Sequence, residues 1–262
     1  MSINLIIIIF VFILGLVFGS FYNVVGYRVP NNMSIVFPNS SCPKCKHTLK
    51  WYELIPVFSY VFQRGRCTCC KEKISIIYPL FELVTATLFA ACYYKFGLSI
   101  DFVISITFVS ILIIITISDF RYYIIPDEVL IFGIVMLLIE FSIKSMSNDF
   151  NFINYLFVPI LHGFASFALL YLFKIFGDFI LKKECLGGGD IKLLLMIGLV
   201  IGFDMSIVTV FLASFIALPI SIFILIKKDD NVLPFGPYLS LASIIILLTN
   251  LNLDIILDFF IK

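Results

Sequence analysis

The chain has 262 residues, of which 61% are hydrophobic and 13% are charged, and its formal net charge is +1. Soluble domains carry about 25% charged residues, so this composition excludes an ordinary soluble domain, a disordered protein, a basic nucleic-acid-binding protein and a small disulfide-rich secreted protein. We therefore expect no nucleic-acid partner.

Long apolar runs recur along the chain, and we interpret about eight of them as membrane-spanning helices, because a crossing needs about 20 apolar residues. Their ranges are 3–25, 74–94, 100–118, 123–143, 152–177, 191–203, 205–226 and 232–260. The sixth run is short, and residues 202–204 are expected to form a tight turn after it. The predicted fold class is an all-α polytopic protein of the lipid bilayer, with a large polar loop between its first two helices.

The first run has an alternative interpretation as a cleaved signal peptide, with cleavage near Gly19 and Ser20. It lacks a basic n-region, exceeds the usual length of the apolar h-region and has no small-residue cleavage site. These features favour a retained membrane helix.

Lysine and arginine predict the orientation, because cytoplasmic connections carry an excess of both. With eight spans, all of the 18 Lys and Arg residues except Lys95, Lys144 and Lys262 fall on one side of the membrane. The connections on that side are residues 26–73, 119–122, 178–190 and 227–231. We expect these connections to face the cytoplasm and both termini to lie outside.

The large loop contains two Cys-x-x-Cys pairs, Cys42 with Cys45 and Cys67 with Cys70, and 21 residues separate the pairs. Two such pairs suit a tetrahedral Zn²⁺ ion, and a closed four-sulfur site is structural because it leaves no open coordination position. Free thiols or redox pairing are the alternative, which the reducing cytoplasm makes poorer. Cys69 is a surplus thiol that could replace Cys67 or Cys70, although the spacing favours the latter two.

Two acidic residues border hydrocarbon on the side that the charges assign to the cytoplasm. Asp119 ends the third run, and Asp190 opens the sixth after Gly187, Gly188 and Gly189. An acid in this position is costly, so a functional role is the default hypothesis. Two acids at one depth could share a proton, which is the chemistry of aspartic peptide hydrolysis. The alternative is that both merely cap or snorkel at helix ends.

These motifs resemble those of the type IV prepilin peptidases, a family of bifunctional leader peptidases and N-methyltransferases. The stretch GSFYNVVGYRVP at 19–30 is similar to the opening signature of that family. The loop is similar to it in CPKC at 42–45, WYELIP at 51–56, GRCTCC at 65–70 and YPLFE at 78–82. The resemblance covers nearly the whole chain.

The resemblance implies that Asp119 and Asp190 are the catalytic pair. The family has one Asp shortly before an Ile-Pro-Asp sequence, which here ends in Asp127, and another in a Gly-x-Gly-Asp motif. Gly187 and Gly189 are then the glycines of that motif, and we expect them and Asp127 to support the loop and the substrate. The middle position, where a bulkier residue is expected, is a glycine in this chain.

The resemblance also implies the reaction and its partners. A membrane-anchored prepilin or pseudopilin would lose a short basic leader by hydrolysis after a Gly, and S-adenosylmethionine would then methylate the new N-terminal amine. The chain has no glycine-rich strand-turn-helix motif of soluble methyltransferases, so methyl transfer is expected from the resemblance alone. Its candidate residues, which could instead hold the zinc loop, are Glu53, Gly65, Arg66 and Glu82.

We divide the chain into residues 1–98, with the first two helices, the four-cysteine loop and the expected methyltransferase part, and residues 99–262, a six-helix aspartic peptidase domain. The resemblance implies a multi-pass protein of the bacterial cytoplasmic membrane, with the large loop and both catalytic acids on the cytoplasmic side. One alternative is an ion-coupled transporter, because intramembrane acids also mark ion paths. Another is a zinc-stabilised scaffold without catalysis.

Overall fold

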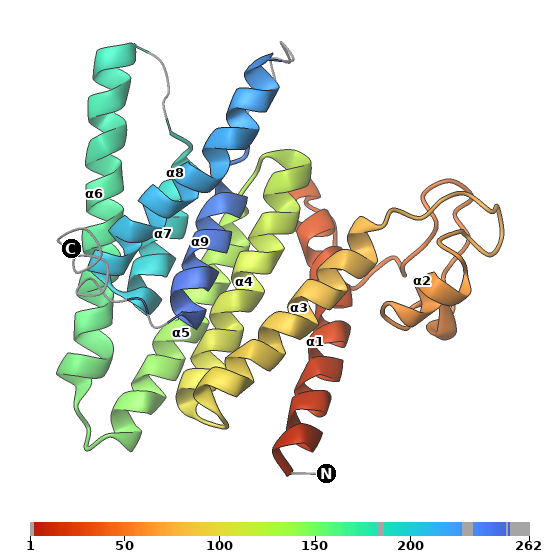
Figure 1. Cartoon of the computed structure of the whole chain (residues 1–262), viewed down its shortest axis with the longest axis horizontal. Helices are drawn as coiled ribbons and strands as arrows, with labels where there is room; N and C mark the ends of the chain where they lie inside the picture. The colour runs from red at the N-terminus through yellow and green to blue at the C-terminus, as the bar shows by residue number, and fades with distance from the viewer. Residues whose placement is uncertain (1–2, 183–185, 227–232, 250, 252–262) are drawn as a thin grey trace. The chain divides into compact units, whose positions relative to one another are not determined.

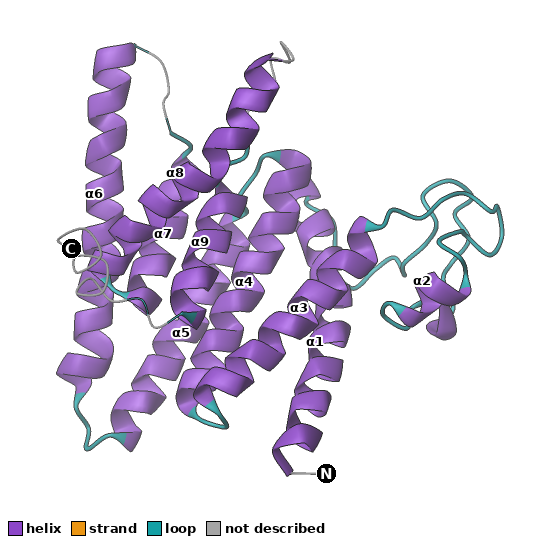
Figure 2. Ribbon diagram, viewed as in Figure 1, coloured by secondary structure: helices purple, strands orange, loops and turns teal. Residues whose placement is uncertain are grey.

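The computed structural model describes residues 3–182, 186–226, 233–249 and 251. In these residues the secondary structure is helical, with two isolated bridges and no named strand (Figure 2). The prediction of an all-α polytopic fold is therefore confirmed. The chain divides into two compact units, Met1–Phe102 and Val103–Lys262, which are described one at a time, and Figure 1 labels their helices.

The first unit is built on two helices, α1 (Ile3–Arg28) and α3 (Ile77–Phe96), that pack closely on each other. A Cβ atom at Gly15 would lie 2.5 Å from the Cα atom of Ala86, so the two backbones meet there without a side chain between them. Between the helices, the loop contains two 3₁₀ turns, η1 (Val29–Asn31) and η2 (Trp51–Glu53), and the short helix α2 (Phe58–Phe62).

The second unit contains the remaining helices. It also contains a π-helical turn, η3 (Ile153–Phe157), which leads directly into the helix Val158–Leu181. Most of α4 lies in this unit, although its first residues belong to the other. The helices are α4 (Ile100–Tyr122), α5 (Asp127–Ser147), α6 (Val158–Leu181), α7 (Gly188–Ile201), α8 (Phe203–Ile226) and α9 (Gly236–Leu248).

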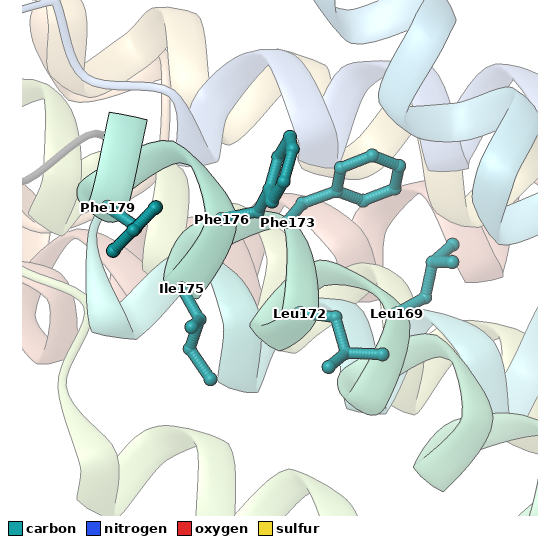
Figure 3. A pocket seen from close by; sticks show the side chains of 6 residues that line it. All are labelled: Leu169, Leu172, Phe173, Ile175, Phe176 and Phe179. Carbon is teal, nitrogen blue, oxygen red and sulfur yellow. The ribbon is translucent and has the colours of Figure 1, made fainter. Parts of the chain in front are cut away.

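Helix α7 is the centre of the second unit, because α5, α6, α8 and α9 all contact it. Its residues Leu193, Leu194 and Ile197 are fully buried. Helix α6 contrasts with it, since one stretch of α6 exposes a series of large apolar side chains (Figure 3). An exposed apolar helix surface of this kind suits contact with lipid.

Six described helices are long and apolar enough to cross a bilayer. The sixth and eighth predicted spans coincide instead with two short helices, α7 of 14 residues and α9 of 13 residues. Helix α7 rises only about 21 Å, less than the hydrocarbon thickness, because it ends where Gly202 takes a positive φ of 85°. Four of the residues behind the predicted orientation, Lys183, Lys227, Lys228 and Lys262, lie outside the described residues, as does the end of the predicted eighth span.

Candidate functional site

The two predicted catalytic acids lie at the ends of two different helices of the second unit. Asp119 is in the last turn of α4 and Asp190 is in the first turn of α7. Their exposed fractions are 5% and 9%, so both carboxyl groups are buried. They are close enough for their charges to interact. The structure thus brings together two acids that are remote in sequence.

The carboxyl group of Asp119 contacts the start of α9. The backbone N–H of Gly236 donates a hydrogen bond to Asp119 Oδ2 at 3.1 Å. A Cβ atom at position 236 would lie 2.7 Å from the same oxygen, so only a glycine permits this approach without movement. The sequence analysis missed Gly236, although the run Pro234-Phe-Gly-Pro237 interrupts an apolar segment and could have drawn attention to it.

The carboxyl group of Asp190 keeps one oxygen without a protein partner. Its Oδ1 atom is buried and accepts no hydrogen bond from the described residues. Burial of an unpaired carboxyl oxygen is costly, and this oxygen is available to a water molecule or a substrate. A Cβ atom at Gly187 would lie 3.0 Å from the other oxygen, whereas one at Gly188 would meet nothing within 4 Å. The motif's middle position therefore has room for the bulkier residue that the family pattern leads us to expect.

The segment 123–126, here called the strap, connects α4 to α5 beside the two acids. The side chain of Ile125 packs closely against two glycines. A Cβ atom at Gly189 would lie 2.9 Å from this side chain, and one at Gly236 would lie 3.1 Å from it. One apolar side chain thus fits between the residue before Asp190 and the residue that hydrogen-bonds Asp119. This packing explains why Gly189 carries no side chain.

An ion pair joins the first residue of α5, directly after the strap, to α7. The Nζ atom of Lys192 donates to both carboxylate oxygens of Asp127, at 2.8 and 2.7 Å. Both side chains are about half exposed. Asp127 therefore pairs with a lysine that lies two residues after Asp190 in the sequence. Lys192, like Gly236, was not selected by the sequence analysis.

The four predicted metal ligands lie together in the loop of the first unit. The Sγ atoms of Cys42, Cys45, Cys67 and Cys70 all lie within 4.8 Å of one another, and Cys69 is exposed and is not part of the cluster. The Sγ distances are 3.8 Å for Cys42 to Cys70 and 3.9 Å for Cys45 to Cys67. A tetrahedron with Zn–S bonds of about 2.3 Å has sulfur–sulfur edges of about 3.8 Å. The four thiols therefore fit a zinc ion.

Each cysteine pair is held by its own backbone turn, and the two turns have the same geometry. Lys46 N–H donates to Cys42 O, and Lys71 N–H donates to Cys67 O, at 2.9 and 3.0 Å. Lys46 and Lys71 have positive φ angles of 59° and 58°, which close each turn around its thiols. This repeated local geometry is what two Cys-x-x-Cys sequences require to present four sulfurs to one ion.

The carboxylate of Glu53 connects the two turns. It accepts hydrogen bonds from Lys50 N–H at 2.8 Å and from the Thr68 hydroxyl, and it lies 3.2 Å from His47 Nε2. The bonds from Lys50 and Thr68 lower the pKa of Glu53 below its usual value. Because Glu53 is buried and its oxygens have partners, these contacts favour support of the loop over a role in methyl transfer.

The other methyl-transfer candidates occupy separate places in the first unit. Gly65 has a positive φ of 65°, and a Cβ atom there would lie 2.8 Å from the hydroxyl of Tyr60. Arg66 is exposed next to the second cysteine pair. Glu82, in α3, is buried, and it accepts a hydrogen bond of 2.7 Å from Val57 N–H. These contacts account for the loop's shape, and they do not identify a site for the methyl donor.

Both units of the chain match models of known protein families. Residues 13–96 match the bacterial peptidase A24 N-terminal domain, and residues 106–222 match the type IV leader peptidase family. The chain is 36% identical over 256 residues to a prepilin leader peptidase/N-methyltransferase of Bacillus subtilis (strain 168), and the alignment covers 96% of each chain. A protein of the same name from Neisseria gonorrhoeae is 30% identical over 271 residues, which is 91% of this chain and 89% of the relative. No solved structure matches the chain significantly.

Proposed function

The chain belongs to the type IV leader peptidase family, and on this premise we propose how it works as a prepilin leader peptidase and N-methyltransferase. It is a multi-pass enzyme of the bacterial inner membrane that removes leader peptides from prepilins and methylates the new N-terminus. Asp119 and Asp190 are its hydrolytic pair. Family membership favours this enzyme over the ion-coupled transporter and the scaffold considered above.

The observation that carries this assignment is that two buried carboxyl groups from separate helices lie close enough for their charges to interact, and one of them keeps an unpaired oxygen. One carboxylate accepts a proton from water, and the resulting hydroxide equivalent attacks the carbonyl carbon of the scissile peptide. The other carboxyl group donates a proton to the carbonyl oxygen. Collapse of the tetrahedral intermediate breaks the C–N bond, with protonation of the departing amine. The products are a leader that ends in a carboxylate and a mature protein with a free amine.

The neighbouring residues fix the positions of the Asp119 and Asp190 side chains. The Gly236 N–H orients Asp119, and the strap packs Ile125 against Gly189, the residue before Asp190, and against Gly236. Gly187 and Gly189 let the Asp190 carboxyl group and the Ile125 side chain lie against the Gly-x-Gly-Asp backbone, and this close packing fixes the loop that an extended substrate strand meets at Asp190. Both acids lie in terminal turns, which suits a scissile bond at the membrane surface next to the substrate's apolar segment.

The orientation and the second activity belong to the same proposal. The Lys and Arg excess supports a cytoplasmic location for the four-cysteine loop and the acid pair, where a prepilin presents its leader. The N-terminal part, residues 1–98, serves methyl transfer, and residues 99–262 serve hydrolysis. The four thiols hold a structural Zn²⁺ ion, which fixes the loop. S-adenosylmethionine supplies the methyl group, and Gly65, Arg66 and Glu82 remain the candidates for that step.

Co-expression of a prepilin with variants of the chain tests the hydrolytic pair. Asp119→Asn and Asp190→Asn keep the shape of the side chain but remove the ionisable group, so each should abolish leader removal, measured by the mass of the substrate. Asp204→Asn is the matched control, because Asp204 is an exposed acid in the first turn of α8. Full cleavage by either of the first two variants would refute the assignment.

A further inference from the structure

The four-cysteine loop exposes a group of large apolar side chains. Trp51 and Phe62 are 78% and 82% exposed, and Tyr52, Phe58 and Val61 are also exposed. Phe58, Val61 and Phe62 are spaced i, i+3 and i+4, so they share one side of α2, and α2 contacts the turn η2 that carries Trp51 and Tyr52. These five residues are here called the aromatic patch. Large apolar side chains that are exposed together on two elements in contact mark an interaction site.

The charge of the same loop is positive. Its two acidic residues are already engaged: Glu53 is buried between the cysteine turns, and Glu72 pairs with Lys44 at 3.0 Å. The Nζ atom of Lys50 lies 5.9 Å from the ring centroid of Tyr52, inside the aromatic patch. Further exposed cations of the loop are Lys46, Arg64, Arg66, Lys71 and Lys73. The loop therefore offers aromatic side chains and unneutralised positive charge together.

The position of the loop keeps it near the membrane surface. It is tied at one end to α1 and at the other to α3, both of which are apolar enough to cross a bilayer. Figure 1 shows that it extends sideways from the junction of these helices and does not continue along the axis of α1. A loop that leaves two bilayer-spanning helices sideways is placed to meet the lipid surface around those helices.

We propose that the aromatic patch docks on the headgroup region of an anionic phospholipid bilayer, next to the helices that tether it. Tryptophan and tyrosine favour this region because their rings are apolar at one end and polar at the other, and lysine and arginine are attracted to anionic headgroups. This docking fixes the loop at the level where α1 and α3 leave the hydrocarbon. It does not depend on the cleavage mechanism, so it can fail while the proposed function stands.

The chain provides its own probe, because Trp51 is its single tryptophan. The full chain is reconstituted in phosphatidylcholine vesicles with and without phosphatidylglycerol, and Trp51 fluorescence is measured with iodide in the water or with lipids brominated near the headgroup. With phosphatidylglycerol present, we expect brominated lipid to lower the emission at least about twofold and iodide to quench it less than it quenches free N-acetyltryptophanamide. Lys50→Gln combined with Arg64→Gln should reverse both effects.

A matched variant calibrates the lipid quenching. Trp51→Phe combined with Phe10→Trp moves the probe to an exposed apolar position within α1, where contact with lipid should not depend on headgroup charge. Unhindered iodide quenching of Trp51 in both kinds of vesicle would overturn the proposal. Protection from iodide that persists in neutral detergent micelles would also overturn it, since the patch would then be covered by protein.

Discussion

The acid site and the four-cysteine loop position their polar side chains by different physical means. At the acid site, helices packed through fully buried leucine and isoleucine side chains carry the two carboxyl groups, and glycines let the backbone approach them. In the loop between Asn32 and Ile76, the buried residues are Cys42, Glu53, Gly65 and Cys67. A segment with so little buried apolar surface cannot hold its shape by packing. Changes of shape should therefore break the first site, and changes of ligand or hydrogen bond should break the second.

The loss of a metal ligand should have the largest effect on the loop. We expect Cys42→Ser or Cys70→Ser to lower the metal content from about one ion per chain to less than about a tenth, because metal binding and folding of such a segment are coupled. N-methylation should fall more than leader cleavage. Metal analysis of the purified protein and mass spectrometry of the substrate N-terminus measure both. Cys69→Ser is the control, since Cys69 lies outside the cluster, and unchanged metal content in Cys42→Ser would contradict the assignment.

A single added methyl group should damage the acid site. Gly236→Ala would place a Cβ atom 2.7 Å from Asp119 Oδ2, so the carboxyl group must move or lose its hydrogen bond. A displacement of this size should reduce the rate of leader cleavage by about 100-fold. Gly188→Ala adds the same methyl group in the same site, where nothing lies within 4 Å, and should cleave at nearly the normal rate. Similar rates for the two variants would show that close packing does not position Asp119.

The two sites also differ in how far the sequence predicts them. A Cys-x-x-Cys turn is local, so the spacing alone was sufficient to select the four thiols that the structure brings together. The approach of Asp119 to Asp190 depends on how the helices of the second unit are arranged, which spacing cannot reveal. The position of both acids at one face of the membrane suggested the pair, and the family resemblance then implied it. Gly236 and Asp119 are separated by 117 positions in the sequence, so no local sequence pattern predicts their contact.

Helix boundaries show the same limit on a smaller scale. The third predicted span ends at residue 118, but α4 continues to Tyr122, and the fourth is predicted from residue 123, whereas α5 begins at Asp127. Hydropathy reports where an apolar run ends. Helix α4 itself ends at Tyr122, because Tyr123 takes a positive φ of 57°, and Ile125 is biased away from helical geometry because it precedes Pro126. The strap between the acids was therefore assigned to the wrong element.

A change at Glu53 should affect the four-cysteine loop less than the loss of a cysteine ligand does. Glu53→Ala removes the acceptor that joins the two cysteine turns but leaves all four thiols, so zinc should still bind, with an affinity reduced by about 10- to 100-fold. Competition with a chromophoric chelator measures this affinity. Glu72→Ala is the matched control, because Glu72 lies in the same loop in an exposed ion pair. Equal affinities for the two variants would remove Glu53 from the support of the metal site.

The ion pair of Asp127 with Lys192 should show the smallest effect, because both side chains are half exposed and such pairs contribute less than about 1 kcal/mol. If the pair positions the strap, Lys192→Met should lower kcat a few-fold and leave KM nearly unchanged, while Lys192→Arg retains activity. The double variant Asp127→Lys, Lys192→Asp should then recover most of the loss. If Asp127 instead attracts the basic leader, KM should rise and the double variant should not recover. The split between kcat and KM therefore decides whether this acid supports the loop or binds the substrate.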